Sequence, residues 1–131
     1  MIVIDTHVLI WWLSNPAELS PKARKAITAA AKSNTVLVSA ISALEITTLV
    51  RHGRLTLAVP VATWLADVRQ LPEVRFTPVT VDIAQMAGEF GDEVPGDPAD
   101  RVISATAMLL MAPLVTADAK LRAYKALETI W

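Results

Sequence analysis

Short apolar runs rich in β-branched residues alternate with longer stretches of helical periodicity along the chain. The runs predict strands over residues 1–4, 35–38, 74–79 and 114–117, with a last edge strand at 129–131. The helical stretches are residues 7–13, 21–33, 39–52, 61–71, 81–90, 101–112 and 119–126, and Thr6, Ser20-Pro21 and Asp97-Pro98 are start signals. Strands alternating with helices predict βαβ units, so we expect one α/β domain over residues 1–131, a three-layer α/β/α sandwich with a mainly parallel central sheet.

The composition limits the kinds of chemistry that this domain can carry out. The chain has 131 residues, of which 53% are hydrophobic and 19% charged, a balance typical of folded rather than disordered proteins. It has no cysteine, and its two histidines are His7 and His52. Thiol nucleophiles, disulfides and cysteine-rich zinc sites are therefore excluded, and any metal must be held mainly by oxygen.

The net charge of −1 gives no sign of a broad basic surface for nucleic acid. A nucleic-acid substrate stays open, because a bound divalent cation supplies positive charge that the sequence does not count. The longest uncharged stretch, residues 102–117, is too short to span a membrane and is interrupted by Pro113. With no signal-peptide pattern either, we expect a cytoplasmic protein with no membrane partner.

Four acidic residues follow predicted strands or open predicted helices, namely Asp5, Glu45, Asp100 and Asp118. Ligands of parallel α/β sheets bind outside the carboxyl ends of the strands, so we expect these carboxylates to meet at one edge. Gathered carboxylates repel one another, and a hard cation such as Mg²⁺ removes that conflict. The chemistry that fits is hydrolysis of a phosphodiester by metal-activated water, which leaves a 5′-phosphate.

Each acid also has a purely structural interpretation. Asp5 is able to cap the first helix, and Asp118 to occupy an ordinary turn. Glu45 completes Ser42-Ala43-Leu44-Glu45, which has the spacing of a capping box. Asp97 is best explained as an N-cap. Asp100 is able to complement the positive end of the same helix. Their shared placement near strand ends favours a common site.

The chain resembles the PIN-domain family of the VapC toxin type. The residues that carry the resemblance are Ile2-Val3-Ile4-Asp5-Thr6-His7-Val8-Leu9-Ile10-Trp11-Trp12, Val38-Ser39-Ala40, Ala43-Leu44-Glu45-Ile46, Gly53-Arg54-Leu55, Asp97-Pro98-Ala99-Asp100-Arg101 and Val115-Thr116-Ala117-Asp118. The resemblance implies a Mg²⁺- or Mn²⁺-dependent endoribonuclease that acts on RNA as a toxin beside a VapB-type antitoxin.

The same resemblance assigns roles to residues of this chain. It makes Asp5, Glu45, Asp100 and Asp118 the metal ligands and catalytic acids, with Thr116 and Thr6 as polar helpers. Many relatives have a histidine just before the Asp-Pro-x-Asp-Arg segment, where this chain has Pro95-Gly96.

Several other residues have two interpretations. Arg101 either holds a carboxylate or phosphate, or forms a structural salt bridge. Arg51, His52 and Arg54 are better explained as a solvated helix end than as an RNA contact. Lys22, Arg24 and Lys25 are interpreted as a solvated helix face. His7 is expected to be structural. The adjacent indoles of Trp11 and Trp12 are hard to bury together, which together with the family resemblance favours a homodimer.

Two other functions stay open at this stage. An aspartyl-phosphate phosphatase or phospho-receiver also uses an aspartate at a strand end, although Asp5-Thr6-His7 lacks a second acid two positions on. A catalytically inactive interaction module of the same fold is the other alternative.

Overall fold

Five parallel strands form one central sheet in the computed structural model, which describes residues 1–131. Their spatial order is β3-β2-β1-β4-β5. The strands are β1 (Ile2–Ile4), β2 (Val36–Ser39), β3 (Val74–Thr77), β4 (Leu114–Val115) and β5 (Thr129–Ile130). The helices are α1 (Thr6–Ser14), α2 (Pro21–Lys32), α3 (Ile41–Arg51), α4 (Val61–Arg69), α5 (Val81–Glu89), α6 (Pro98–Leu109) and α7 (Ala119–Ala123), with a short 3₁₀ turn η1 (Pro16–Glu18).

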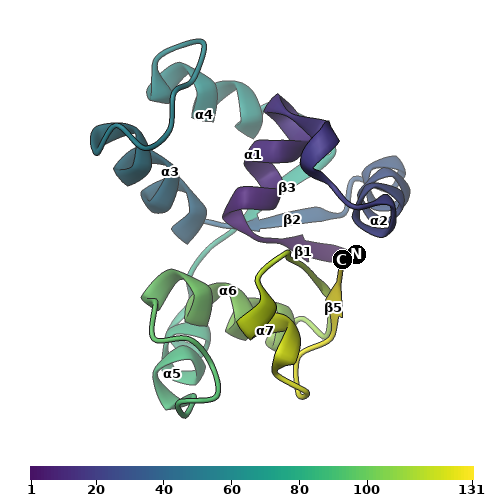
Figure 1. Cartoon of the computed structure of the whole chain (residues 1–131), viewed down its shortest axis with the longest axis vertical. Coiled ribbons are helices and arrows are strands. Elements are labelled where there is room, and N and C mark those ends of the chain that lie inside the picture. Colours follow the sequence, from purple (N-terminus) through teal and green to yellow (C-terminus); the bar gives the residue numbers. More distant parts are fainter.

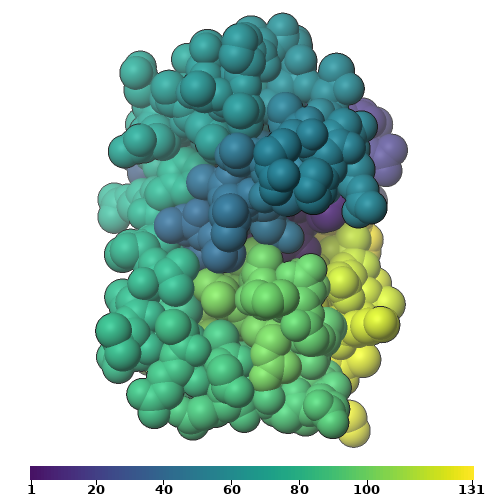
Figure 2. Space-filling view, turned by 90° about the vertical axis from the view of Figure 1, so that its left-hand side faces the viewer, coloured from purple at the N-terminus to yellow at the C-terminus, as the bar shows by residue number.

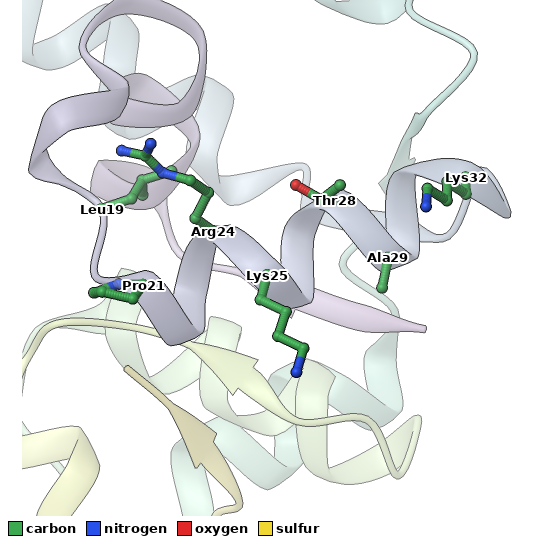
Figure 3. A pocket seen from close by; sticks show the side chains of 7 residues that line it. All are labelled: Leu19, Pro21, Arg24, Lys25, Thr28, Ala29 and Lys32. Atoms are coloured by element: carbon green, nitrogen blue, oxygen red, sulfur yellow. The ribbon is translucent and has the colours of Figure 1, made fainter.

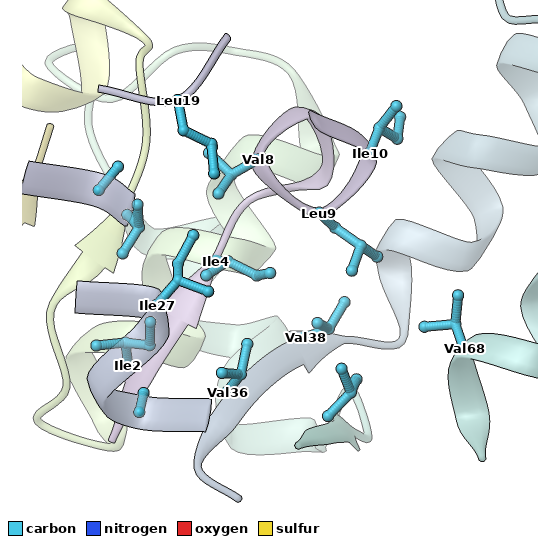
Figure 4. Close-up of a cluster of buried hydrophobic side chains, with 14 of the residues drawn as sticks. Ile2, Ile4, Val8, Leu9, Ile10, Leu19, Ile27, Val36, Val38 and Val68 are labelled. Atoms are coloured by element: carbon cyan, nitrogen blue, oxygen red, sulfur yellow. The ribbon is translucent and has the colours of Figure 1, made fainter. Parts of the chain in front are cut away.

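The helices cover both faces of the sheet, which gives the expected three layers. Figure 1 shows α1 to α4 on one side of the strands and α5 to α7 on the other. Because successive strand residues point to opposite faces, Ile2 and Ile4 pack under α1 and α2, whereas Val3 packs against α6 and α7. Figure 4 shows the first of these clusters, in which Leu9, Ile27 and Val38 are buried.

The predicted α/β/α architecture is confirmed, and the differences lie at the ends of elements. β3 and β5 occupy the two edges of the sheet, and an edge position was predicted for the strand at residues 129–131. β4 covers only Leu114–Val115, and α7 ends at Ala123 instead of 126. Thr6 was expected to cap the first helix, but the cap is Asp5, whose side chain accepts from the Val8 N–H. None of the helices combines the length and apolar character that crossing a lipid bilayer requires.

Arg101 fixes the segment that joins α5 to α6. Its guanidinium donates to the carbonyl oxygens of Ala87 (2.9 Å), Phe90 and Val94 (3.3 Å), and lies over the Phe90 ring at 5.7 Å. Its partners are thus main-chain oxygens, and the expected carboxylate contact or salt bridge is not found. The reason is helical geometry, since neighbouring residues on α6 point in different directions and Arg101 faces α5.

Replacing Arg101 with Met should destabilise the fold while leaving the chemistry of each folded molecule intact. The variant keeps the apolar stem but leaves several carbonyl oxygens without a donor, which costs about 2 kcal/mol of unfolding free energy. Chemical denaturation measures the loss, with Arg75→Met on the exposed edge strand as the control. A variant of unchanged stability with weakened RNA binding would instead make Arg101 a ligand contact.

Candidate active site at the carboxyl edge of the sheet

A hollow of about 310 Å³ lies where β1 and β4 end, and we call it the acid pocket. Its lining residues are Asp5, Thr6, His7, Trp11, Glu45, Asp97, Asp100, Ala117 and Asp118. Five of these carry carboxylates and none is Lys or Arg. Figure 2 shows purple N-terminal residues recessed between blue and teal residues above, green residues below and yellow residues beside them. The structure thus brings together the four acids predicted from sequence, which come from distant segments of the chain.

Thr116 ties Asp5 to Asp118 at the ends of neighbouring strands. The Asp5 Oδ1 atom accepts from the Val8 N–H at 3.0 Å, and its Oδ2 atom accepts from the Thr116 hydroxyl. The Thr116 oxygen in turn accepts from the Asp118 N–H at 3.1 Å. Both acids also cap helices, since Asp118 Oδ1 accepts from two N–H groups at the start of α7. The capping interpretation and the site interpretation therefore apply to the same carboxylates.

Glu45 is held by the Thr6 hydroxyl, which is itself bonded to the Ser42 hydroxyl. Thr6 donates its proton to Glu45 Oε1, so the buried Ser42 hydroxyl, 2.8 Å from the Thr6 oxygen, must be the donor in that second contact. The capping-box interpretation of Glu45 is wrong, because α3 begins at Ile41 after Ala40 and has no side-chain cap. Sequence reasoning missed the role of Ser42, although it lies one helical turn before Glu45 and therefore on the same side of α3.

Replacing Ser42 with Ala should loosen Glu45. The loss of one buried hydrogen bond costs about 1 kcal/mol of unfolding free energy, and activity that depends on Glu45 should fall roughly tenfold. Ser104→Ala is the matched control, because the Ser104 hydroxyl is equally buried but has no hydrogen-bond partner. Its removal should leave stability unchanged or slightly higher. Equal effects of the two substitutions would show that Ser42 only fills space.

Asp97 and Asp100 bring two more carboxylates from the start of α6. Asp97 is the N-cap, as predicted, and its Oδ1 accepts from the Ala99 N–H at 2.8 Å. The structure adds that Asp97 also lines the acid pocket. Asp100 lies in the first turn of α6 and is half-buried.

The pocket raises the pKa values of three of its carboxyl groups. Burial raises the pKa of Asp5, against the Thr116 and Val8 hydrogen bonds and His7, which lower it. Burial also raises the pKa of Glu45, while the hydrogen bond from Thr6 lowers it. The pKa of Asp100 rises to about 7, first through burial and then through repulsion from Asp97, Asp118, Glu45 and Asp5. The site therefore has an excess of negative charge that the protein itself does not neutralise.

This donor set suits a hard divalent cation. Every donor facing the pocket apart from His7 and Trp11 is oxygen-based, as Mg²⁺ and Mn²⁺ prefer. No group of three His, Asp or Glu side chains is arranged to bind one ion directly. Mg²⁺ usually keeps several water ligands and takes only one or two protein carboxylates, so the remaining acids fit as partners of those waters.

His7 and Trp11 form a wall of the acid pocket that the sequence reasoning missed. They are four positions apart on α1, so they share one helix face, and their ring centroids are 5.9 Å apart. Trp11 also packs against Trp131, with the ring centroids 5.9 Å apart. Trp11 and Trp12 are half-buried against the protein's own core, so their burial needs no second copy. The homodimer stays a prediction.

A larger hollow, of about 690 Å³, lies elsewhere and has a different character. It runs along the outer face of α2, where Arg24, Lys25 and Lys32 line it (Figure 3). None of its lining residues is acidic. The α2 hollow therefore lacks the carboxylate donors that suit the acid pocket to a divalent cation.

The strand order and the acid pocket define a class of small α/β/α domains with carboxylates gathered at one sheet edge. Residues 2–127 match the family model described as PIN: PIN domain, and the chain belongs to this family. Ribonuclease VapC22 of Mycobacterium tuberculosis is 40% identical over 125 residues, covering 95% of this chain and 92% of the relative. The resemblance inferred from sequence is thereby confirmed.

Solved structures share the fold. A crystal structure of VapBC2 from Rickettsia felis bound to a DNA fragment from their promoter has a TM-score of 0.71 at 18% identity, covering 98% of this chain and 97% of that one. FitAcB from Neisseria gonorrhoeae has a TM-score of 0.62 at 22% identity, covering 98% and 96%. At these identities the likeness concerns the fold alone.

Proposed function

We propose that this protein is a metal-dependent endoribonuclease and the toxin of a toxin-antitoxin pair. The observation that carries the proposal is the acid pocket, in which five carboxylates without a compensating cation meet at the carboxyl edge of a PIN-domain sheet. The 40% identity to a relative named as a ribonuclease supports RNA as the substrate. Two structural neighbours, VapBC2 from Rickettsia felis and a structure described as a toxin-antitoxin complex from Klebsiella pneumoniae, support a VapB-type antitoxin as the partner.

Within this proposal, Asp5, Glu45, Asp100 and Asp118 hold Mg²⁺ or Mn²⁺, directly or through water. The bound cation supplies charge neutralisation at the scissile phosphate and a more acidic water molecule. The protein contributes orientation: Thr116 fixes Asp5 and Asp118, and Thr6 fixes Glu45. The rings of His7 and Trp11 border the pocket and offer faces on which a base of the substrate can pack.

The aspartyl-phosphate alternative is disfavoured by the hydrogen bonds of Asp5. One of its oxygens accepts from the Val8 N–H and the other from the Thr116 hydroxyl. Hydrogen bonds to both oxygens stabilise the charged carboxylate, which makes it a weaker nucleophile. Asp5 is better suited to orient a cation or a water molecule.

The test of the proposal is cleavage of single-stranded RNA with Mg²⁺, with Mn²⁺ and with a chelator. We expect cleavage with either metal, none after chelation, and products that carry a 5′-phosphate, detected by end-specific ligation. Cleavage that persists unchanged in the chelator would contradict the metal-dependent proposal, and a metal-bound protein that never cuts RNA would support the inactive-module alternative.

A further inference from the structure

A second hollow adjoins the acid pocket along one face of α3, and we call it the α3 groove. It measures about 300 Å³, and the residues that characterise it are Ile41, Leu44, Thr48, Leu49, His52 and Arg54. Ile41, Leu44 and Thr48 follow one another at spacings of three and four positions, as do Leu49 and His52, so these side chains form one continuous stripe. Leu44 is 62% exposed within this stripe, an apolar side chain that the fold itself does not need to bury.

The α3 groove changes character along its length. Glu45 and Asp97 line both it and the acid pocket, so the two hollows are continuous. Apolar side chains follow, and His52 and Arg54 stand at the far end. At 1.5 Å per residue, His52 lies about 10 Å from Glu45 along the helix axis. His52 is therefore well separated from the Glu45 carboxylate, in the part of the groove where Arg54 supplies positive charge.

The backbone at the end of α3 brings Arg54 back to this face. Gly53 has a φ of +71°, in the left-handed region that glycine adopts most easily, and reverses the chain. The Gly53 N–H donates to the Val50 carbonyl at 3.0 Å, and the Arg54 N–H donates to the Leu49 carbonyl at 2.9 Å. Gly53 and Arg54 thus follow the end of the helix and place the positive charge of Arg54 at the end of the groove far from the acid pocket.

We propose that the α3 groove binds the nucleotides of single-stranded RNA that flank the scissile phosphate in the acid pocket. This inference rests on the proposed function and deepens it. Single-stranded RNA offers apolar base faces and a repeating phosphate charge, and proteins bind it with apolar or aromatic platforms beside cations. Leu44 and Ile41 supply the apolar platform, Thr48 and His52 reach base edges or faces, and Arg54 binds the next phosphate.

The other side of the acid pocket extends the path. A third hollow shares Asp97, Asp100 and Asp118 with the acid pocket and includes Lys120. A cation therefore stands beyond each side of the carboxylates, with Arg54 at one end and Lys120 at the other. This alternation of charge matches a strand whose central phosphate is neutralised by a metal and whose flanking phosphates are bound by side chains.

The test measures RNA binding rather than turnover, so that it is independent of cleavage. Fluorescence anisotropy with a short labelled single-stranded RNA and Mg²⁺ is used in the Asp5→Asn background, where Asn keeps the cap on the Val8 N–H. Leu44→Ser should weaken binding about fivefold or more without changing its salt dependence. Arg54→Ala should weaken binding and reduce the slope of log affinity against log salt by about 0.7.

Two exposed side chains away from the groove supply the controls. Val81→Ser removes an exposed apolar side chain on α5, and Lys25→Ala removes a cation from the α2 hollow. Both should leave RNA affinity unchanged. Unchanged RNA affinity in Leu44→Ser and Arg54→Ala would overturn the proposal. If these two variants instead lost affinity for an antitoxin, the groove would be a protein-binding surface, and the proposal would be overturned as well.

The two proposals fail in different ways. Wild-type protein that does not cleave RNA, but whose variants show the expected binding pattern, contradicts the nuclease and supports the groove. Wild-type protein that cleaves RNA with no effect of Leu44→Ser or Arg54→Ala on binding supports the nuclease and overturns the groove.

Discussion

Replacing Asp5 with Asn should lower the rate of metal-dependent RNA cleavage by about a hundredfold or more, while the protein stays folded. The amide oxygen can still accept from the Val8 N–H, so the helix cap is kept. What is lost is the negative charge at the end of β1, where the pocket holds its cation in the proposed mechanism. Single-turnover cleavage of labelled RNA at saturating Mg²⁺ measures the effect.

The control for this prediction is Asp67→Asn on α4. Asp67 is an exposed acid outside the acid pocket, so the same change of charge there should alter cleavage less than twofold. Circular dichroism and thermal melting establish that both variants are folded. A folded Asp5→Asn protein that cuts RNA at the wild-type rate would remove Asp5 from the mechanism.

Replacing Asp100 with Asn should stabilise the metal-free protein and abolish most of its stabilisation by Mg²⁺. The pKa of Asp100 is raised to about 7 by burial and by four neighbouring carboxylates. The folded state binds a proton on Asp100 more tightly than the unfolded state does. The stability gained from this proton is therefore fully present below about pH 4 and is lost as the pH rises through about 7. The metal-free wild-type protein should therefore melt at a lower temperature at pH 8 than Asp100→Asn, and the gap should close toward pH 4.

Mg²⁺ should narrow this difference. At a Mg²⁺ concentration of a hundred times Kd, binding to the native state adds about 2.7 kcal/mol of stability, which is a rise of roughly 10 °C in Tm for a domain of this size. Asp100→Asn should show less than half of that rise. Thermal melts with and without Mg²⁺ at pH 8 test both halves of the prediction.

Asp82→Asn is the matched control, because Asp82 also lies in the first turn of a helix but is exposed. A carboxylate there is favoured by the helix dipole, so its neutralisation should leave Tm unchanged or lower it slightly. Opposite signs for the two substitutions would establish that the acid pocket, and not the helix position, makes Asp100 unfavourable. Equal signs would contradict the repulsion that the pKa of Asp100 implies.

The fold was predictable because each of its layers has a local signal. Alternation of apolar runs and periodic stretches gave the strands and helices, and parallel pairing then required that Asp5 and Asp118 end at the same edge. The element ends were less certain, because β4 depends on its pairing with β1 and β5 and not on its own apolar run. Pairing partners that are far apart in sequence leave no local pattern.

The parts of the site that escaped prediction depend on side chains from distant segments. Glu45 was compatible with a capping box because Ser42 has the correct spacing, but the hydroxyl that holds it comes from Thr6, 39 positions away. Arg101 follows Asp100 directly in sequence, but the rotation of the helix between neighbouring residues turns its side chain toward α5. His7 and Trp11 carried the i, i+4 spacing of a shared face, which was the available signal for their place in the pocket.

The bond between Asp5 and Thr116 joins residues 111 positions apart. During synthesis on the ribosome, β1 is made early, yet it cannot pair with β4 until all the elements between them have been synthesised. A nascent chain that stops after α6 has neither Asp118 nor the hydroxyl that orients Asp5. The chemistry of this pocket therefore cannot begin before β4 and the residues that follow it have been synthesised.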